Sequence, residues 1–477
     1  MVDPHRLLAA YETCRLDLLA QRTDAGHWVG ELAASALSTA TAVSALSIDL
    51  RESKRPIAGD HPMKGLIDRG VEWLLTQQNS DGGWGDTDRS CSNIATTMLC
   101  AAAIHLAGAA ENCSSALRRA EAYCAEMGRA AGGTSSGSSP SLRDGLPALR
   151  KRYGKDKTFV VPILTNCALA RLVDWKDVSP LPFELACVPQ KWYHLVNMPV
   201  VSYAIPALVA IGQARHFHKP SRNPLIRVIR QRSVNRTMQV LLDMQPKSGG
   251  YLEATPLTSF VVMSLASTGR REHPVTRNGI RLLLESVRPD GSWPIDTNLA
   301  TWVTTLSINA LAGAGEDVSE LDCLPWLLRC QHRQKHPFTG AEPGGFGWTD
   351  LSGAVPDADD TPGALLALDA IRKSPRTTST QQQQIADAAA QGLTWLLDLQ
   401  NDDGGWPTFC RGWGKLPFDR SGCDLTAHVL RAIRAWRDDF HPEAFRRPVV
   451  RGFRYLERRQ RADGAWLPLW FRNQEDP

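Results

Sequence analysis

Apolar and polar residues recur along this chain with the spacing of amphipathic helices, and several of these helices end in a similar segment. Its three clearest copies are Trp73–Trp84, Trp395–Trp406 and Tyr455–Trp466. In each copy the last tryptophan follows a glutamine by six positions. The second and third copies lie 60 residues apart (466 minus 406), which leaves room for two helices with their connections. Such a period is typical of stacked helical hairpins.

Each copy predicts a local structure. An apolar helix face ends at the glutamine, and Asp-Gly then makes a turn because glycine accepts positive φ. We expect the tryptophan to lie across the glutamine amide and to couple neighbouring hairpins. Weaker copies occur at 21–28, 245–251 and 287–293, whereas strand signals are sparse. The sequence therefore predicts an all-α protein of two α/α barrel domains, residues 5–270 and 271–477.

Three segments stand apart from these repeats. Residues 131–141 have the composition of a flexible loop, and residues 377–384 are expected to connect two helices at the surface. Residues 215–236 are basic, and four apolar residues are interleaved with the charges: Leu225, Ile226, Val228 and Ile229. For this run we favour a solvated helix with one core face. The alternative is an interfacial helix that rests on anionic lipid.

The composition is that of a globular protein without a strong charge field. Of 477 residues, 43% are apolar and 22% are charged, enough for a sizeable core. A net charge of +4 is too small to suggest nucleic acid as a partner. The eleven cysteines show no CxxC pair and no zinc-ligand spacing, so we expect reduced thiols in a cytoplasmic protein without a metal site. Neither a signal-peptide core nor an apolar run of 18 residues is present.

The strongest chemical signal is a cluster of three carboxyl groups, Asp357, Asp359 and Asp360, directly ahead of an apolar helical run. Like charges this close oppose full ionisation, and burial raises a carboxyl pKa by up to ~3–5 units. A carboxyl group that stays protonated near neutral pH is a proton donor. The competing interpretation is a helix cap, but a cap needs only one acid.

A second segment, Asp424–His428, raises the same choice. Asp424 is a candidate N-cap, and His428 follows one turn later on the same helix face. Alone, the two residues would be interpreted as a cap and a satisfied core histidine.

Together the two segments resemble the squalene–hopene cyclases and related class II terpene cyclases, which carry an Asp-x-Asp-Asp motif and repeated Gln–Trp segments. Asp357–Asp360 matches the acidic motif, and Asp424–His428 matches the family's Asp-Val-Thr-Ala-His segment. The resemblance extends from about Gln21 to Trp470. It implies that Asp359 protonates a terminal alkene and starts a cationic ring-closing cascade, which needs no cofactor.

The same resemblance implies roles for other residues. Asp357 and Asp360 would flank the acid, and His428 would be its hydrogen-bond partner, with Asp424 behind. Four tryptophans match positions that line the family's pocket: Trp175, Trp302, Trp348 and Trp470. Desolvated aromatic faces stabilise a cation by about 2 kcal/mol or more without capturing it.

The resemblance also implies that the second barrel is incomplete. Family members continue for further helices beyond the part that matches Trp466–Pro477. We therefore expect a chain that lacks the C-terminal part, with an active-site barrel that water can reach.

The leading hypothesis is a polyene cyclase of squalene or a similar isoprenoid, with hopene-type triterpenes as products. Because such a substrate lies in membranes, we expect a cytoplasmic protein attached peripherally to a membrane surface. The sequence leaves open whether the protein forms a homodimer.

Two alternatives also stay open. A class II cyclase of a prenyl diphosphate would need a basic patch, for which six residues are candidates: Arg143, Arg150, Lys151, Arg152, Lys155 and Lys157. We favour a solvated loop for these charges. The other alternative is a catalytically inactive homologue that only binds an isoprenoid or a partner chain.

Overall fold

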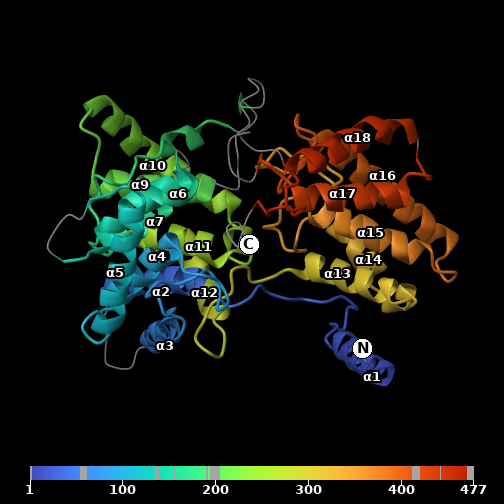
Figure 1. The fold of residues 1–477 in the computed structure, drawn as a ribbon. Coiled ribbons are helices and arrows are strands. Elements are labelled where there is room, and N and C mark those ends of the chain that lie inside the picture. Colours follow the sequence, from blue (N-terminus) through green and yellow to red (C-terminus); the bar gives the residue numbers. More distant parts are fainter. Residues whose placement is uncertain are drawn as a thin grey trace. The chain divides into compact units, whose positions relative to one another are not determined.

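A computed structural model of the protein describes residues 3–53, 62–134, 139–154, 157–189, 192–193, 205–410, 419–440 and 442–469. These residues are mainly helical, which confirms the prediction of an all-α protein. A short antiparallel pairing joins β1 (Trp406–Pro407) to β2 (Ser421–Gly422). The chain forms two compact units (Figure 1): the N-terminal unit, residues 31–192 and 202–297, and the C-terminal unit, residues 1–30, 193–201 and 298–477.

A closed ring of inner helices forms the centre of the N-terminal unit. These helices pack in the order α2 (Ala36–Arg51), α4 (Ile94–Leu106), α7 (Lys157–Leu169), α9 (Ile205–His218) and α11 (Thr255–Ala266), and α11 packs on α2 again. The outer helices are α3 (Pro62–Thr76), α5 (Ser114–Ala130), α6 (Leu146–Tyr153), α10 (Pro224–Met244) and α12 (Pro274–Glu285). The inner helix α2 is buried on nearly every side, whereas α12 buries one apolar face. This arrangement is an α/α barrel.

The C-terminal unit repeats the hairpin pattern. Its inner helices α13 (Ala300–Gly313), α15 (Asp360–Arg372) and α17 (Cys423–Trp436) pack in that order, and Figure 1 shows them as successive layers. The outer helices are α14 (Leu324–Cys330), α16 (Ser379–Leu399) and α18 (Pro442–Arg459), and α1 (Pro4–Ala20) belongs to the same unit. Over the residues described, no packing of comparable extent joins α17 back to α13. The three inner helices therefore form an open row.

Short 3₁₀ helices complete the described secondary structure of both units. Three lie in the N-terminal unit: η1 (Leu142–Gly145), η2 (Phe183–Cys187) and η3 (Tyr251–Glu253). One, η4 (Val318–Leu321), lies in the C-terminal unit.

The units divide at 297/298 and not at the predicted boundary of 270/271. The segment after residue 270 packs into the N-terminal unit, where the backbone N–H of Trp293 donates to Thr39 Oγ1 at 3.0 Å. The first 30 residues group instead with the C-terminal unit. There the backbone N–H of Trp28 donates to Thr304 Oγ1 at 3.0 Å. The boundary between the units therefore depends on which repeats contact each other, and the sequence alone does not show these contacts.

Helix α16 also differs from its prediction. Residues 379–384 are helical and do not form a connecting segment. The side chain of Thr378 accepts from the backbone N–H of Gln381, and the Gln381 side chain accepts from the backbone N–H of Thr378. This capping box begins the helix.

The repeated segments couple neighbouring hairpins through a glutamine amide. One amide N–H donates to a turn glycine carbonyl and the other to a carbonyl of the next outer helix, all at 2.8–2.9 Å. The glutamines are Gln78, Gln245, Gln331 and Gln400, and their helix acceptors are Ala116, Val275, Ala388 and Pro448. Gly404 has a φ of 94°, and a Cβ there would lie 2.5 Å from the Arg451 carbonyl. Only glycine permits this approach.

The tryptophan of each copy bonds to its own helix and not to the glutamine. The indole N–H groups of Trp84, Trp293 and Trp406 each donate at 2.7 Å to a carbonyl ten residues earlier, and these side chains are completely buried. The last copy differs, because Trp466 is 45% exposed. Among the described residues, Gln460 donates to the Gly464 carbonyl alone. This repeat is therefore half assembled.

This difference predicts unequal costs for the same substitution. Trp406→Phe removes the N–H that satisfies the buried Leu396 carbonyl, so we expect a loss of about 1–3 kcal/mol in the free energy of unfolding. Trp466→Phe should cost less than about 0.5 kcal/mol, because water replaces the lost bond. Urea unfolding of both variants measures the difference. Equal losses would contradict the assigned role of the indole bond.

Candidate active site

The carboxylate of Asp357 organises the start of α15. Its Oδ1 accepts the backbone N–H groups of Asp359 at 2.9 Å and Asp360 at 2.6 Å. Asp359 occupies the N-cap position, but its side chain makes no capping bond. Asp357 therefore caps the helix, and the side chain of Asp359 is left for another contact.

Asp357 and Asp360 are buried, with exposed fractions of 2% and 4%. Burial raises the pKa of Asp357 to about 7, although the amides that it accepts oppose this rise. Burial, and then the carboxylates of Asp357 and Asp359, raise the pKa of Asp360 well above its usual value. Asp357 Oδ2 and Asp360 Oδ1 are buried and have no hydrogen-bond partner among the described residues. Burial and the neighbouring charges therefore favour the protonated form of these two carboxyl groups.

Asp359 faces the other way. Its Oδ1 lies 3.1 Å from Nδ1 of His428, which is 69 residues away in the sequence on α17. The side chain of Asp359 is 44% exposed and that of His428 is 21% exposed. The cluster therefore contains one accessible carboxyl group with a histidine partner and two buried ones.

Backbone bonds to the segment around Phe346 hold the acid motif in place. The backbone N–H of Asp357 donates to the Phe346 carbonyl at 2.9 Å, and Thr361 Oγ1 accepts the backbone N–H of Phe346 at 2.9 Å. Asp357 also pairs with Phe409 across an isolated bridge. Sequence reasoning missed Phe346, Thr361 and Phe409 as supports, because single residues of these types carry no signal of their own.

Cys410 follows this bridge. Its thiol is buried, and burial raises its pKa to about 12. A buried thiol with a raised pKa is a poor nucleophile, so Cys410 is a packing residue here.

Two of the predicted pocket tryptophans lie in the same unit. The backbone carbonyl of Trp348 accepts the N–H groups of Thr301 and Trp302 at 3.0 and 3.1 Å, so it holds the start of α13. The ring of Trp348 lies 5.7 Å from that of Phe409, centroid to centroid. Its buried indole N–H has no partner among the described residues. Trp302 is half-buried on α13.

Other predicted residues are placed differently. Trp175 belongs to the N-terminal unit and stacks on His218, with the ring centroids 4.5 Å apart. Asp424 is exposed in the first turn of α17, and no hydrogen bond joins it to His428 in the part of the chain that the structure describes. Its expected support for His428 is therefore not formed. Trp470 lies outside the described residues.

The candidate diphosphate patch is partly neutralised. Arg143 forms an ion pair with Asp174, and Arg150 lies 3.4 Å from Asp177. Lys155 lies outside the described residues. Lys151, Arg152 and Lys157 complete the predicted set.

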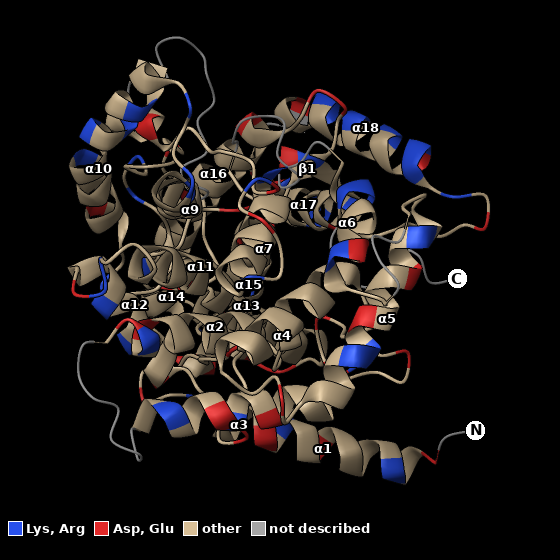
Figure 2. Ribbon diagram, turned by 90° about the vertical axis from the view of Figure 1, so that its left-hand side faces the viewer, with Lys and Arg blue, Asp and Glu red and all other residues tan. Residues whose placement is uncertain are grey.

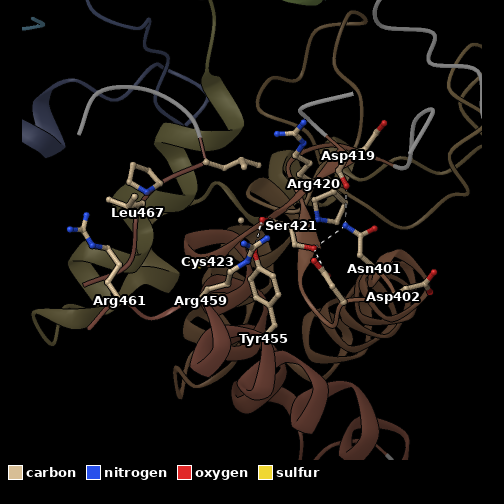
Figure 3. Close-up of a pocket in the computed structure, with 15 residues that line it drawn as sticks. Asn401, Asp402, Asp419, Arg420, Ser421, Cys423, Tyr455, Arg459, Arg461 and Leu467 are labelled. Carbon is tan, nitrogen blue, oxygen red and sulfur yellow. Dashed lines mark hydrogen bonds between the residues drawn. The ribbon is translucent and has the colours of Figure 1, made fainter. Parts of the chain in front are cut away.

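A cavity of about 680 Å³ lies in the C-terminal unit (Figure 3), between the turn after Gln400, β2 and the last repeat. Figure 3 shows the polar side chains of Asn401, Asp402, Asp419 and Arg459 around it. None of the predicted site residues lines it. Its mixed charge does not suit an apolar substrate.

Neither a metal-binding cluster nor a membrane-spanning helix is found among the described residues. No group of three or more His, Cys, Asp or Glu side chains is arranged to hold a metal ion within the described ranges. Over the same ranges, none of the helices combines the length and apolar character that a bilayer crossing requires.

Comparison with known families identifies two matched regions. Residues 12–137 match the squalene–hopene cyclase N-terminal domain, and residues 298–474 match the squalene–hopene cyclase C-terminal domain. The second match begins where the C-terminal unit resumes after the N-terminal unit.

Curated relatives extend the likeness. The chain is 26% identical over 336 residues to a squalene–hopene cyclase of Alicyclobacillus acidocaldarius, covering 64% of this chain and 50% of the relative. It is 24% identical over 544 residues to enfumafungin synthase of Hormonema carpetanum, covering 94% of this chain and 37% of the relative. For sporulenol synthase of Bacillus subtilis the identity is 27%, with 54% and 41% covered. The chain thus spans half or less of the length of these relatives.

Among solved structures, the type II terpene cyclase MstE from Scytonema aligns with 84% of this chain and 81% of its own at 16% identity. The TM-score of this alignment is 0.18.

The buried pair predicts how stability depends on pH. The folded state holds protons that the unfolded chain releases above about pH 4, because the folded pKa values are raised. Stability should therefore be fully present below that pH and fall as pH rises through about 7. Urea unfolding measured across this pH range gives the slope of the free energy of unfolding against pH.

Asp360→Asn removes one of the two titrating groups and keeps the backbone N–H that donates to Asp357. We expect a shallower slope for this variant. Asp387→Asn makes the same charge change at an exposed position of α16 and should leave the slope as in the wild type. A wild-type slope in Asp360→Asn would contradict the assignment.

Proposed function

Because the chain belongs to the squalene–hopene cyclase family of class II terpene cyclases, we propose that it cyclises squalene or a similar long isoprenoid by protonating a terminal alkene. One observation carries this proposal. Asp357 caps α15, so the carboxyl group of Asp359 makes no capping bond and lies against His428 instead. An accessible acid beside a fixed hydrogen-bond partner is what protonation of a very weak base requires.

The reaction begins with a proton transfer. The π electrons of the terminal alkene take the proton of Asp359, which leaves a tertiary carbocation on the substrate and a carboxylate on Asp359. The nearby imidazole of His428 stabilises that carboxylate by a hydrogen bond at Oδ1. Internal alkenes then attack the cation in turn, and each attack closes a ring. The last cation loses a proton or captures water, and solvent reprotonates Asp359.

Asp357 and Asp360 act through the acid. Together they keep a second proton in the motif, so that two neighbouring full negative charges do not oppose the formation of the Asp359 carboxylate. Asp357 also holds the backbone N–H of Asp359, and thereby sets where the acid points. Both are positioning residues.

The aromatic side chains would guide the cation. Trp302 and Trp348 lie in the same unit as the acid, and we assign them to the pocket. Because the side chain of Asp359 is 44% exposed, this proposal requires that bound substrate or further protein covers the acid during the reaction. Trp175 and Trp470 stay expected pocket residues on the resemblance alone.

The apolar substrate implies a membrane surface, and α10 offers the best candidate for contact. Four apolar side chains in its first turns are exposed, by 38–67%: Leu225, Ile226, Val228 and Ile229. The buried face of α10 is formed further along by Val234, Met238 and Leu241, so the four are not the core face expected for this run. Exposed arginines accompany them (Figure 2), among them Arg222, Arg227 and Arg232. We propose that this end of α10 rests on an anionic membrane at the cytoplasmic face.

The acid assignment predicts that Asp359→Asn abolishes cyclisation of squalene in detergent. The amide cannot deliver the proton, and the loss should exceed 1,000-fold because no other group replaces it. Product formation is measured by gas chromatography with mass spectrometry. Asp387→Asn, an equal charge change on the surface of α16, should retain activity.

The same assay separates the alternative functions. Wild-type protein that cyclises geranylgeranyl diphosphate but not squalene would replace the triterpene assignment with a prenyl diphosphate cyclase. Wild-type protein that binds squalene without forming a product from either substrate would identify an inactive binding homologue. Squalene cyclisation retained in Asp359→Asn would remove Asp359 as the acid.

The membrane proposal predicts that wild-type protein sediments with vesicles of phosphatidylcholine and phosphatidylglycerol. The double variant Leu225→Glu/Val228→Glu places two negative charges against an anionic surface and should reduce the bound fraction at least tenfold. Leu7→Glu/Leu16→Glu is the matched control, because these leucines of α1 are 62% and 58% exposed. An equal loss in both double variants would contradict specific docking through α10.

A further inference from the structure

Gly363 lies where α15 meets both of its inner neighbours. It is the fourth residue of α15, which packs against both α13 and α17. A Cβ at this position would lie 3.1 Å from Thr305 Oγ1 of α13 and 3.6 Å from His428 Cε1 of α17. A methyl group there would be a few tenths of an ångström too close to Thr305 and would already touch His428.

The α13 side of this space is held in place. Thr305 Oγ1 donates to the Trp302 carbonyl at 3.0 Å, and Asn309 Nδ2 donates to the Gly363 carbonyl at 3.2 Å. These bonds tie the hydroxyl to its own helix and tie the Gly363 backbone to α13. A group added at Gly363 thus meets a fixed neighbour on this side.

The α17 side carries the chemistry. Cε1 of an imidazole is bonded directly to Nδ1, and Nδ1 of His428 lies 3.1 Å from Asp359 Oδ1. If alanine replaced Gly363, Thr305 would push the new methyl group toward His428. The methyl group would then press on Cε1 of the imidazole and move Nδ1 with it. A shift of a few tenths of an ångström changes a hydrogen bond at this distance.

We propose that Gly363 is a positioning residue, which sets the contact between His428 and Asp359 by leaving the imidazole room beside Thr305. This inference rests on the proposed function for its catalytic consequence. The geometric part stands on the contacts of Gly363 alone. Glycine in the first turns of a helix is otherwise costly, because alanine is favoured there by up to about 1 kcal/mol.

The experiment compares Gly363→Ala with Gly392→Ala in the full chain. Gly392 of α16 is a matched control, because its Cβ would also meet a side chain at 3.1 Å, namely Leu365 Cδ2, but not His428. We expect Gly363→Ala to lower kcat for squalene about 10-fold and to change KM less than twofold. Gly392→Ala should leave both kcat and KM within twofold of the wild-type values.

A double-mutant cycle locates the cause. Thr305→Ala removes the hydroxyl that confines the new methyl group, so Gly363→Ala should lower kcat less than twofold in that background. A full 10-fold loss in both backgrounds would overturn the proposal. A Gly363→Ala protein with wild-type kcat would overturn it as well.

A measurement without substrate separates this proposal from the function on which it rests. In protein labelled with ¹³C-histidine, the Cε1–H resonance of His428 is assigned by its absence in His428→Gln. Gly363→Ala should shift this resonance, and Gly392→Ala should not. An unshifted resonance overturns the positioning role even if the wild type cyclises squalene. A shifted resonance supports it even if the wild type forms no product.

Discussion

The capping of α15 by Asp357 is the interaction on which the site depends. One carboxylate oxygen accepts two backbone N–H groups, so the helix begins without a contribution from the Asp359 side chain. If Asp359 had to cap its own helix, its carboxyl oxygens would be held by those N–H groups and could not lie against His428. The division between Asp357 and Asp359 therefore separates a structural carboxylate from a proton donor within three residues.

The repeats hold that start of helix in place. Gln331 joins the turn ahead of the motif to α16, while Phe346 bonds to both Asp357 and Thr361. The repeat contact thus reaches the acid motif through a few backbone bonds. Because α13 and α17 both pack on α15, the same hairpins bring Thr305 and His428 to it. Helix α15 therefore both packs in the row of inner helices and begins at the acid motif.

The sequence predicted the helical hairpins well, because the glutamine and tryptophan of each repeat stand at a fixed offset from a helix end. It also brought Asp359 and His428 together through resemblance. It failed at the unit boundary, since the pairing of Trp293 with Thr39 joins residues 254 positions apart. It missed the start of α16, where the capping box of Thr378 and Gln381 looks like low-complexity loop. The outward position of Asp424 depends on helix orientation, which no local pattern encodes.

The central claim is that catalysis starts with a proton from Asp359, whose carboxyl hydrogen exchanges with solvent. The most direct measurement is the reaction of the wild-type protein with squalene in deuterium oxide, followed by mass spectrometry and NMR of the product. The account predicts a cyclic product with a deuterium on the carbon that was the CH of the terminal alkene. A cyclic product with no deuterium at that carbon would contradict it.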